Sequence, residues 1–189
     1  GSFNELNIST PITGAATLTK TGAGTLSLNG SGSWTGGTII SGGELWLNAN
    51  STLPSIGPVT INHTDGGTRA YLRLGDNVSQ SIGALTFGGT GAGSSSTNEL
   101  ELRSGSVLTL GGIVTVSATG NTLTAMISGA GTLALGGNRT FDIGGSSTAM
   151  TGLGVATVIS GANQSITKIG TGTLKFEAPN TYSGGTTVS

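Results

Sequence analysis

One pattern of residues occurs twice in this chain at a constant, gapless spacing. Residues 20–41 (KTGAGTLSLNGSGSWTGGTIIS) return 148 positions later as residues 168–189 (KIGTGTLKFEAPNTYSGGTTVS), with Trp34 matched by Tyr182. A partial third copy, ISGAGTLAL, occupies residues 127–135. Units this small cannot bury an apolar face alone, so we expect the repeats to stack into one continuous core.

Short stretches with apolar residues two positions apart fill much of the chain. In residues 25–28 (TLSL) both leucines point to one face of a strand and the polar residues to the other. The same alternation occurs at Leu45/Leu47, Val59/Ile61, Leu72/Leu74, Leu85/Phe87, Leu100/Leu102, Leu108/Leu110, Leu133/Leu135 and Leu174/Phe176. Because 36 of the 189 residues are glycine and β-branched residues are frequent, long helices are disfavoured. The sequence therefore predicts an all-β protein of many short strands.

Recurring glycine motifs predict the length of one coil. Three strands end alike, in ALTFGG, VLTLGG and LALGG, and their leading leucines, Leu85, Leu108 and Leu133, lie 23 and 25 residues apart. A corner motif, Ile-Ser/Thr-Gly-Ala/Gly, begins at positions 12, 40, 127 and 159. This interval suits one turn of a β-solenoid and predicts about eight or nine coils in a single elongated domain. We also expect one or two strands in residues 3–19 and a short helical turn in residues 48–59.

Charge and cysteine content exclude several functions. The net charge of −1, from 7 basic and 8 acidic residues, leaves no electrostatic footprint for nucleic acid. Without cysteine there is neither a disulfide framework nor a thiolate metal site. No apolar run reaches transmembrane length. We therefore expect no nucleic-acid partner and no membrane insertion by this segment, and we assign no catalytic residue, metal or cofactor.

The one concentration of polar chemistry is HTDGGTRAYLRLGD, residues 63–76. It holds His63, Asp65, Asp76, Arg69 and Arg73, the residue types that a β-helical lyase or hydrolase uses.

The alternation of this stretch favours another interpretation. Ala70, Leu72 and Leu74 take the inner face of a strand, which places Arg69, Tyr71 and Arg73 outside. A similar outer row follows about one coil later at Glu99, Glu101 and Arg103. We predict a solvated ladder of charges here, so that replacing both Arg69 and Arg73 by Ser leaves the fold intact. Arg69, Tyr71 and Arg73 remain candidate ligand contacts.

The aromatic residues offer a second candidate surface. Trp34, Trp46 and Tyr182 could stack on sugar rings, which makes Trp34 and Trp46 candidate ligand contacts as well. The alternative is that Trp34 and Tyr182 pack at equivalent corners of the solenoid, since they occupy one repeat position. We favour packing.

The two full copies, together with the GGELWLN that follows the first, resemble the autotransporter-associated β-strand repeat, also called the passenger-associated transport repeat. The resemblance implies a right-handed parallel β-helix in an exported bacterial protein, extracellular or at the cell surface. It transfers no catalytic residue, so we expect no enzyme. Copy one continues past residue 41 whereas copy two ends at residue 189, so we expect residues 1–189 to be a β-helix segment of a larger repeat protein.

Three functions follow as expectations. The first is a structural stalk or adhesin-like segment of an autotransporter passenger domain. The second is a subunit of an extracellular fibre, joined head to tail through open β-helix ends. The third is a polysaccharide-binding or polysaccharide-degrading β-helix. The partners expected are other repeats of the same protein, neighbouring copies end to end, and host or environmental glycans.

Overall fold

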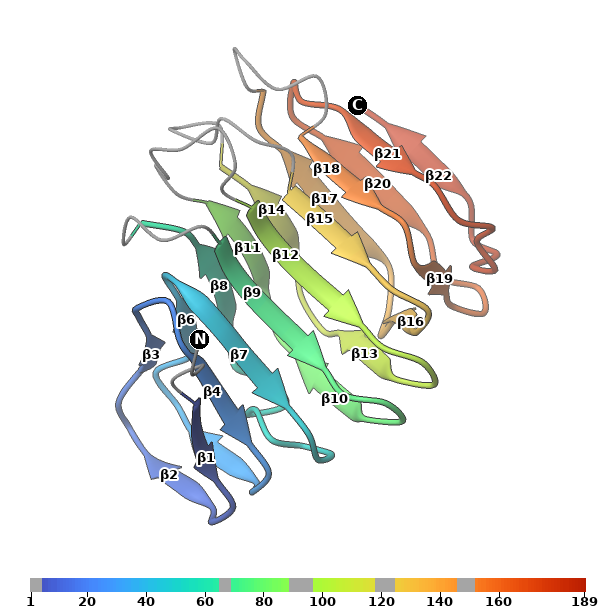
Figure 1. Ribbon diagram of the computed structural model, residues 1–189. Helices are drawn as coiled ribbons and strands as arrows, with labels where there is room; N and C mark the ends of the chain where they lie inside the picture. Colours follow the sequence, from blue (N-terminus) through green and yellow to red (C-terminus); the bar gives the residue numbers. More distant parts are fainter. Residues whose placement is uncertain (1–4, 65–68, 89–96, 118–124, 146–151) are drawn as a thin grey trace.

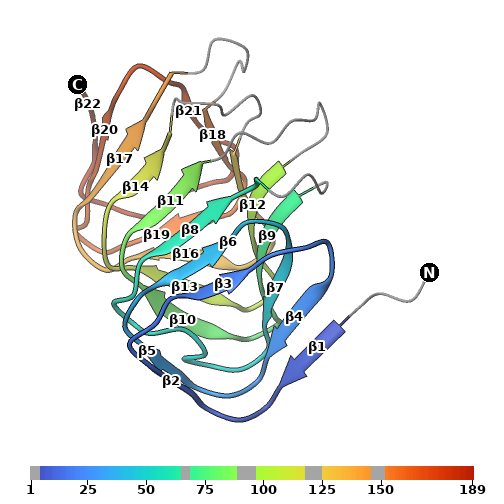
Figure 2. The same ribbon diagram turned by 90° about the vertical axis from the view of Figure 1, so that its left-hand side faces the viewer.

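The computed structural model describes residues 5–64, 69–88, 97–117, 125–145 and 152–189, and in these ranges it contains 22 strands and no helix. The chain winds through three faces, and each strand pairs in parallel with a strand of a neighbouring coil (Figure 1). Viewed from the end, the three faces enclose one core (Figure 2). The predicted parallel β-helix is confirmed, with eight coils.

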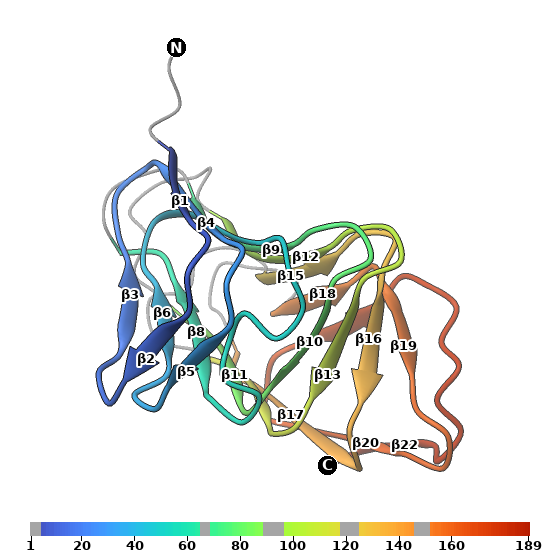
Figure 3. The same cartoon turned by 90° about the horizontal axis from the view of Figure 1, so that it is seen from below.

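The strands form two long faces and one shorter face. The first face is an eight-stranded sheet, in the order β1 (Glu5–Ile8), β4 (Thr25–Leu28), β7 (Gly43–Leu47), β9 (Arg69–Leu74), β12 (Thr97–Leu102), β15 (Ala125–Ser128), β18 (Leu153–Val155) and β21 (Leu174–Phe176). The second face is also eight-stranded, with β3 (Leu18–Lys20), β6 (Thr38–Ile40), β8 (Val59–Asn62), β11 (Leu85–Gly88), β14 (Val114–Val116), β17 (Arg139–Ile143), β20 (Ile166–Ile169) and β22 (Thr186–Val188). The third face holds a pair, β2 (Ile12–Gly14) and β5 (Gly32–Trp34), and a four-stranded sheet, β10 (Ser79–Ile82), β13 (Val107–Leu110), β16 (Thr132–Leu135) and β19 (Val158–Ser160) (Figure 3).

Apolar side chains stack in register along the inside of the rod. On the first face one such row runs through Leu26, Leu45, Leu72, Leu100, Ile127 and Val155. The exposed fraction is at most 8% for every residue of this row. All the predicted apolar pairs are buried except Leu174 and Phe176, which are half-buried in the last coil. Each fully buried side chain contributes about 1.5 to 3 kcal/mol, so the stacked rows hold the coils together.

The predicted coil interval is right for one pair of strands and wrong for the other. Leu108 pairs with Leu133 of the next coil, so their 25-residue separation is one coil. Leu85 lies instead in β11 on the second face, where it pairs with Val59 and Val114. The motif occurs on the second face at β11 and on the third face at β13 and β16, because it consists only of an apolar pair followed by glycine at a corner.

Two local expectations are also corrected. Where one or two strands were expected in residues 3–19, residues 5–20 contain three, β1, β2 and β3, which together make one complete coil. Residues 48–59 form turns without a helix, and Gly57 N donates to Pro54 O at 3.0 Å to close one of them. Proline removes a backbone donor and fixes φ, so this segment turns the corner without a third-face strand.

Glycine at the corners has a steric cause. Gly43 has φ +65°, and a Cβ there would lie 2.3 Å from the carbonyl oxygen of Gly24. Gly129 has φ +104°, and its Cβ would lie 2.1 Å from Leu102 O. Gly43 leads into the first face, whereas Gly129 leaves it, so the corner motif marks different corners in different coils.

Candidate functional site

Charged and aromatic side chains gather on the outside of the first face. We call Glu44, Trp46, Arg69, Tyr71, Arg73 and Glu101 the outer cluster; they come from β7, β9 and β12. The predicted alternation places them there, since Ala70, Leu72 and Leu74 on the same strand are fully buried inside. Parallel pairing then sets Trp46 beside Arg73, and Arg73 beside Glu101.

Arg73 joins three coils through its guanidinium group. Its Nη1 lies 2.6 Å from Glu44 Oε1 in the preceding coil, and its Nε donates to Glu101 Oε2 in the next at 2.5 Å. Arg69 Nη2 approaches the other oxygen of Glu44 at 3.5 Å. The Tyr71 hydroxyl donates to Glu101 at 3.1 Å. The carboxylates of the outer cluster are therefore paired within the protein.

The aromatic rings of the outer cluster lie under the arginines. The Arg73 guanidinium carbon is 5.0 Å from the centre of the Tyr71 ring and 5.5 Å from that of Trp46, both within the range of cation–π attraction. The indole Nε1 of Trp46 is buried and has no hydrogen-bond partner among the described residues. Arg73 thus lies over one face of the Trp46 ring, and the residue as a whole is half-buried.

Burial and charge both act on the titratable groups of the outer cluster. Burial raises the pKa of the Tyr71 hydroxyl far above its ordinary value, and the negative charge of Glu99 adds to the rise. Burial alone would lower the pKa of Arg73, but its hydrogen bonds and the carboxylates of Glu101 and Glu44 raise it above its ordinary value. Both residues keep the protonation state that the contacts need.

The outer cluster is therefore not the solvated ladder that the alternation predicts. Glu44 is only 6% exposed, and the side chain of Arg73 is 22% exposed. Because large neighbours in the coils above and below cover them, loss of Arg73 would leave the Glu44 carboxylate buried without its ion-pair partner. That replacing both Arg69 and Arg73 by Ser leaves the fold intact stays a prediction, but the burial of Glu44 implies that the Arg73 replacement costs stability, whereas the side chain of Arg69 is 47% exposed.

The polar residues of the 63–76 stretch do not converge on one site. His63 is buried just after β8, and its backbone N donates to Asn98 Oδ1 at 2.9 Å. Asp76 follows the far end of β9 and lies 3.3 Å from Arg103 Nε. Asp65 lies outside the described residues. Within the described ranges no three His, Asp or Glu side chains come together as a metal site would need.

Trp34 and Tyr182 pack at equivalent places. Trp34 is 3% exposed, and its Nε1 donates to Gly37 O at 2.8 Å and lies 3.2 Å from Thr38 Oγ1. The Tyr182 hydroxyl meets Thr186 Oγ1 at 2.5 Å, and Thr186 is the repeat equivalent of Thr38. Trp34 lies on the third face and Trp46 on the first, so they do not form one sugar-stacking platform.

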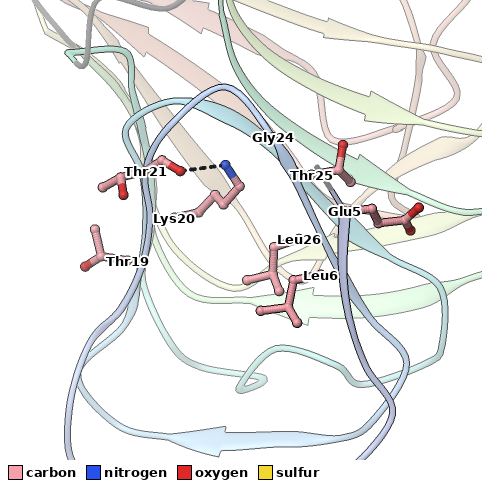
Figure 4. Close-up of a pocket in the computed structure, with 8 residues that line it drawn as sticks. All are labelled: Glu5, Leu6, Thr19, Lys20, Thr21, Gly24, Thr25 and Leu26. Atoms are coloured by element: carbon pink, nitrogen blue, oxygen red, sulfur yellow. Dashed lines mark hydrogen bonds between the residues drawn. The ribbon is translucent and has the colours of Figure 1, made fainter. Parts of the chain in front are cut away.

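Lys20 is a structural residue that the sequence analysis missed. Its side chain bends into the corner after β3, where Nζ donates to Thr21 O at 2.8 Å (Figure 4). The same Nζ donates to Gly22 O at 2.8 Å and to Gly42 O at 3.0 Å. The residue is 8% exposed, and Gly42 leads into the next coil. Lys168, at the same repeat position, donates likewise to Gly170 O. A lysine opening both copies, in a chain with only 7 basic residues, was the signal for this corner clamp.

Replacing Lys20 by Met is expected to lower the free energy of unfolding by about 2 kcal/mol, because three charge-assisted bonds to carbonyl groups are lost, one of them buried. Chemical denaturation measures the change. Lys175→Met is the matched control, since the Lys175 side chain is 61% exposed on the outside of β21. Equal stability of the two variants would contradict the clamp.

Comparison with known proteins identifies the repeated segments. The family profile described as passenger-associated-transport-repeat matches residues 18–47 and 166–189. No curated protein and no solved structure matches the chain significantly. No helix that could span a membrane occurs among the described residues. The matched segments contain β3 to β7 and β20 to β22. Two segments of this chain therefore match the passenger-associated transport repeat, the repeat family that their sequence resembles.

Proposed function

We propose that this chain is a rigid structural segment of an exported bacterial passenger domain, a stalk that holds other parts of the protein away from the cell surface. The observation that carries the proposal is the unbroken register of two eight-stranded parallel sheets around one core. A rod in which every coil is bonded to the next resists bending, because bending must separate coils on one side.

The chemistry of the described residues supports a structural role. The carboxylates of the outer cluster are engaged by Arg69, Tyr71 and Arg73, which leaves none poised as a general acid or base. For an adhesive contact the chain would use the outer cluster, in which Arg69 has the most exposed charged side chain. Nothing in the described part of the chain favours a polysaccharide-degrading site.

Distance measurement between spin labels tests the rod. The chain has no cysteine, so Glu5→Cys and Lys175→Cys introduce unique labelling sites on β1 and β21, both on the outside of the first face. Seven coil steps of ~4.8 Å predict about 34 Å between the two backbones. Labelled chains are diluted in unlabelled protein so that only distances within a chain are read.

A narrow distribution near this distance supports the stalk, and a broad one would refute it. Export is tested separately by expressing the chain between a secretion signal and a membrane anchor in a bacterium. An epitope placed ahead of residue 1 should then be reached by antibody on intact cells.

A further inference from the structure

The turn at residues 48–58 borders a hydroxyl-lined hollow on the outside of the third face. This segment takes the place of a third-face strand between β5 and β10, so the sheet is interrupted there. The hollow has a volume of about 280 Å³ and lies between the turn and the strands β10 and β13 of the next two coils (Figure 3). Five hydroxyl side chains line it: Ser51, Ser55, Ser79, Ser81 and Thr109. Side chains from three successive coils therefore meet at the interruption.

The turn beside the hollow is fixed to β10. Gln80 is 3% exposed, and its side-chain amide bonds both backbone groups of Leu53: Leu53 N donates to Oε1 and Nε2 donates to Leu53 O, each at 3.0 Å. Ser51 N donates to Ser79 O at 3.2 Å. The amide of Gln80 thus replaces the ladder bonds of the missing strand from inside, and the outer side of the face stays open.

Ser51, which lines the hollow, has an unusual backbone conformation. Its φ of 55° lies in the left-handed region, which residues with a side chain rarely adopt. The other two residues with side chains in this region, within the described ranges, are Asn77 and Asn163, and asparagine tolerates it better than serine. Backbone strain that is held in place by surrounding contacts is typical of ligand-binding sites.

The hydroxyl groups of the hollow make no hydrogen bond within the part of the chain that the structure describes. By contrast, the hydroxyls of Ser106 and Thr157 donate to backbone carbonyl oxygens at 2.7 Å. Each hydroxyl in the hollow is therefore available both as a donor and as an acceptor. None of the residues that line the hollow is charged, so it suits a neutral ligand with several hydroxyl groups better than an ion.

An apolar hollow lies on the other side of the same turn. Its volume is about 370 Å³, and Pro54, Ile56 and Pro58 are among the residues that line it. Ile56 is 88% exposed, and Ser55 lines both hollows. A sugar ring has hydroxyl groups around its edge and an apolar C–H face, which gains free energy when it leaves water for an apolar surface. Two linked sugar rings match the two adjoining hollows.

We infer that the turn at residues 48–58, together with β10 and β13, binds a neutral oligosaccharide. One ring lies in the hydroxyl-lined hollow, where it exchanges its hydrogen bonds with water for bonds to Ser79, Ser81 and Thr109. The next ring lies against Ile56. This site is separate from the outer cluster, which is on the first face, and its function is additional to the proposed stalk and independent of it.

Two double variants of the full chain test the site. Ser81→Ala with Thr109→Val removes two hydroxyls that lie side by side on β10 and β13. Thr132→Val with Ser160→Ala is the matched control, because these residues lie on β16 and β19 of the same face, outside the hollow. All four side chains are half-buried, so both proteins are expected to keep the melting temperature of the parent.

Binding is followed by ¹H–¹⁵N NMR titration. Cellotetraose, maltotetraose and chitotetraose are the neutral probes, and tetragalacturonate is the charged comparison. At least one neutral probe is expected to shift the backbone amide signals of residues 51–53, 79–81 and 107–109. The Ser81→Ala, Thr109→Val protein should bind that probe about tenfold more weakly, since two hydrogen bonds to the ligand are lost, and the control should bind it like the parent.

The inference would be overturned if no neutral probe shifted these signals, or if the shifts mapped to another part of the chain. It would be overturned equally by tighter binding of tetragalacturonate, or by the same loss of affinity in both double variants. None of these results changes the label distance along the rod, so the proposed stalk is decided separately.

Discussion

Replacement of Leu108 by Asp is expected to lower the free energy of unfolding by about 4 kcal/mol or more. Leu108 is fully buried on β13, in the fifth of eight coils, between Gln80 and Leu133 of its neighbours. A carboxylate at this point has no cation to pair with inside the core and must either stay charged in an apolar medium or take up a proton. Because each coil is stabilised by the two beside it, the damage in a central coil also weakens the contacts of both halves.

The neighbouring residue provides the control for this variant. Thr109→Asp introduces the same side chain one position along, on the partly exposed outer side of β13, and should change stability by no more than about 0.5 kcal/mol. Urea denaturation followed by circular dichroism measures both variants. If the two variants lost equal stability, the inward orientation of Leu108 would be wrong.

Replacement of Arg73 by Met is expected to cost about 2 to 3 kcal/mol. Arg73 is the cation closest to Glu44, which is 6% exposed, and a buried carboxylate without its partner costs several kcal/mol. We set the value below that of a fully buried pair because part of Arg73 reaches solvent. Met keeps most of the apolar length of the side chain, so the loss reports on the charge and its hydrogen bonds. The same denaturation experiment measures it.

Arg69→Met is the matched control, since Arg69 contacts Glu44 only at 3.5 Å and is largely exposed; its loss should cost less than about 1 kcal/mol. The double variant Glu44→Gln with Arg73→Met should recover part of the stability, because an uncharged amide is cheaper to bury. If the double variant were less stable than Arg73→Met alone, the unpaired Glu44 carboxylate would not be the cause of the lost stability.

The fold could be predicted from the sequence because both of its signals, the alternation of apolar residues and the repeated segments, are visible in the order of residues alone. The alternation of apolar residues sets which side chains point inward, as Leu72 and Leu74 do, and the repeat requires that each unit be covered by another. The face on which a strand lies is not local. Leu85 was placed one coil from Leu108 because its strand ends in the same motif, whereas the length of each corner decides the face.

The alternation that predicts the fold gives no information on the outer cluster or on the Lys20 clamp, for a related reason. How deeply Glu44 is covered depends on Arg73 and Tyr71 in the next coil, and their register follows from coil lengths that vary along the chain. A lysine is also expected to be exposed to solvent, because its ammonium group can be buried only where several carbonyl oxygens accept its hydrogen bonds. Such convergence arises at a corner of the folded chain and leaves no alternation in the sequence.

In the parallel sheets, the hydrogen bonds between coils point along the long axis of the molecule. Tension applied to the two ends of the rod therefore falls first on the ladder of a terminal coil, and the bonds of the next coil are loaded only after that ladder has opened. Under mechanical load the protein would lengthen in successive steps, each releasing one coil, and so would dissipate a sudden pull gradually.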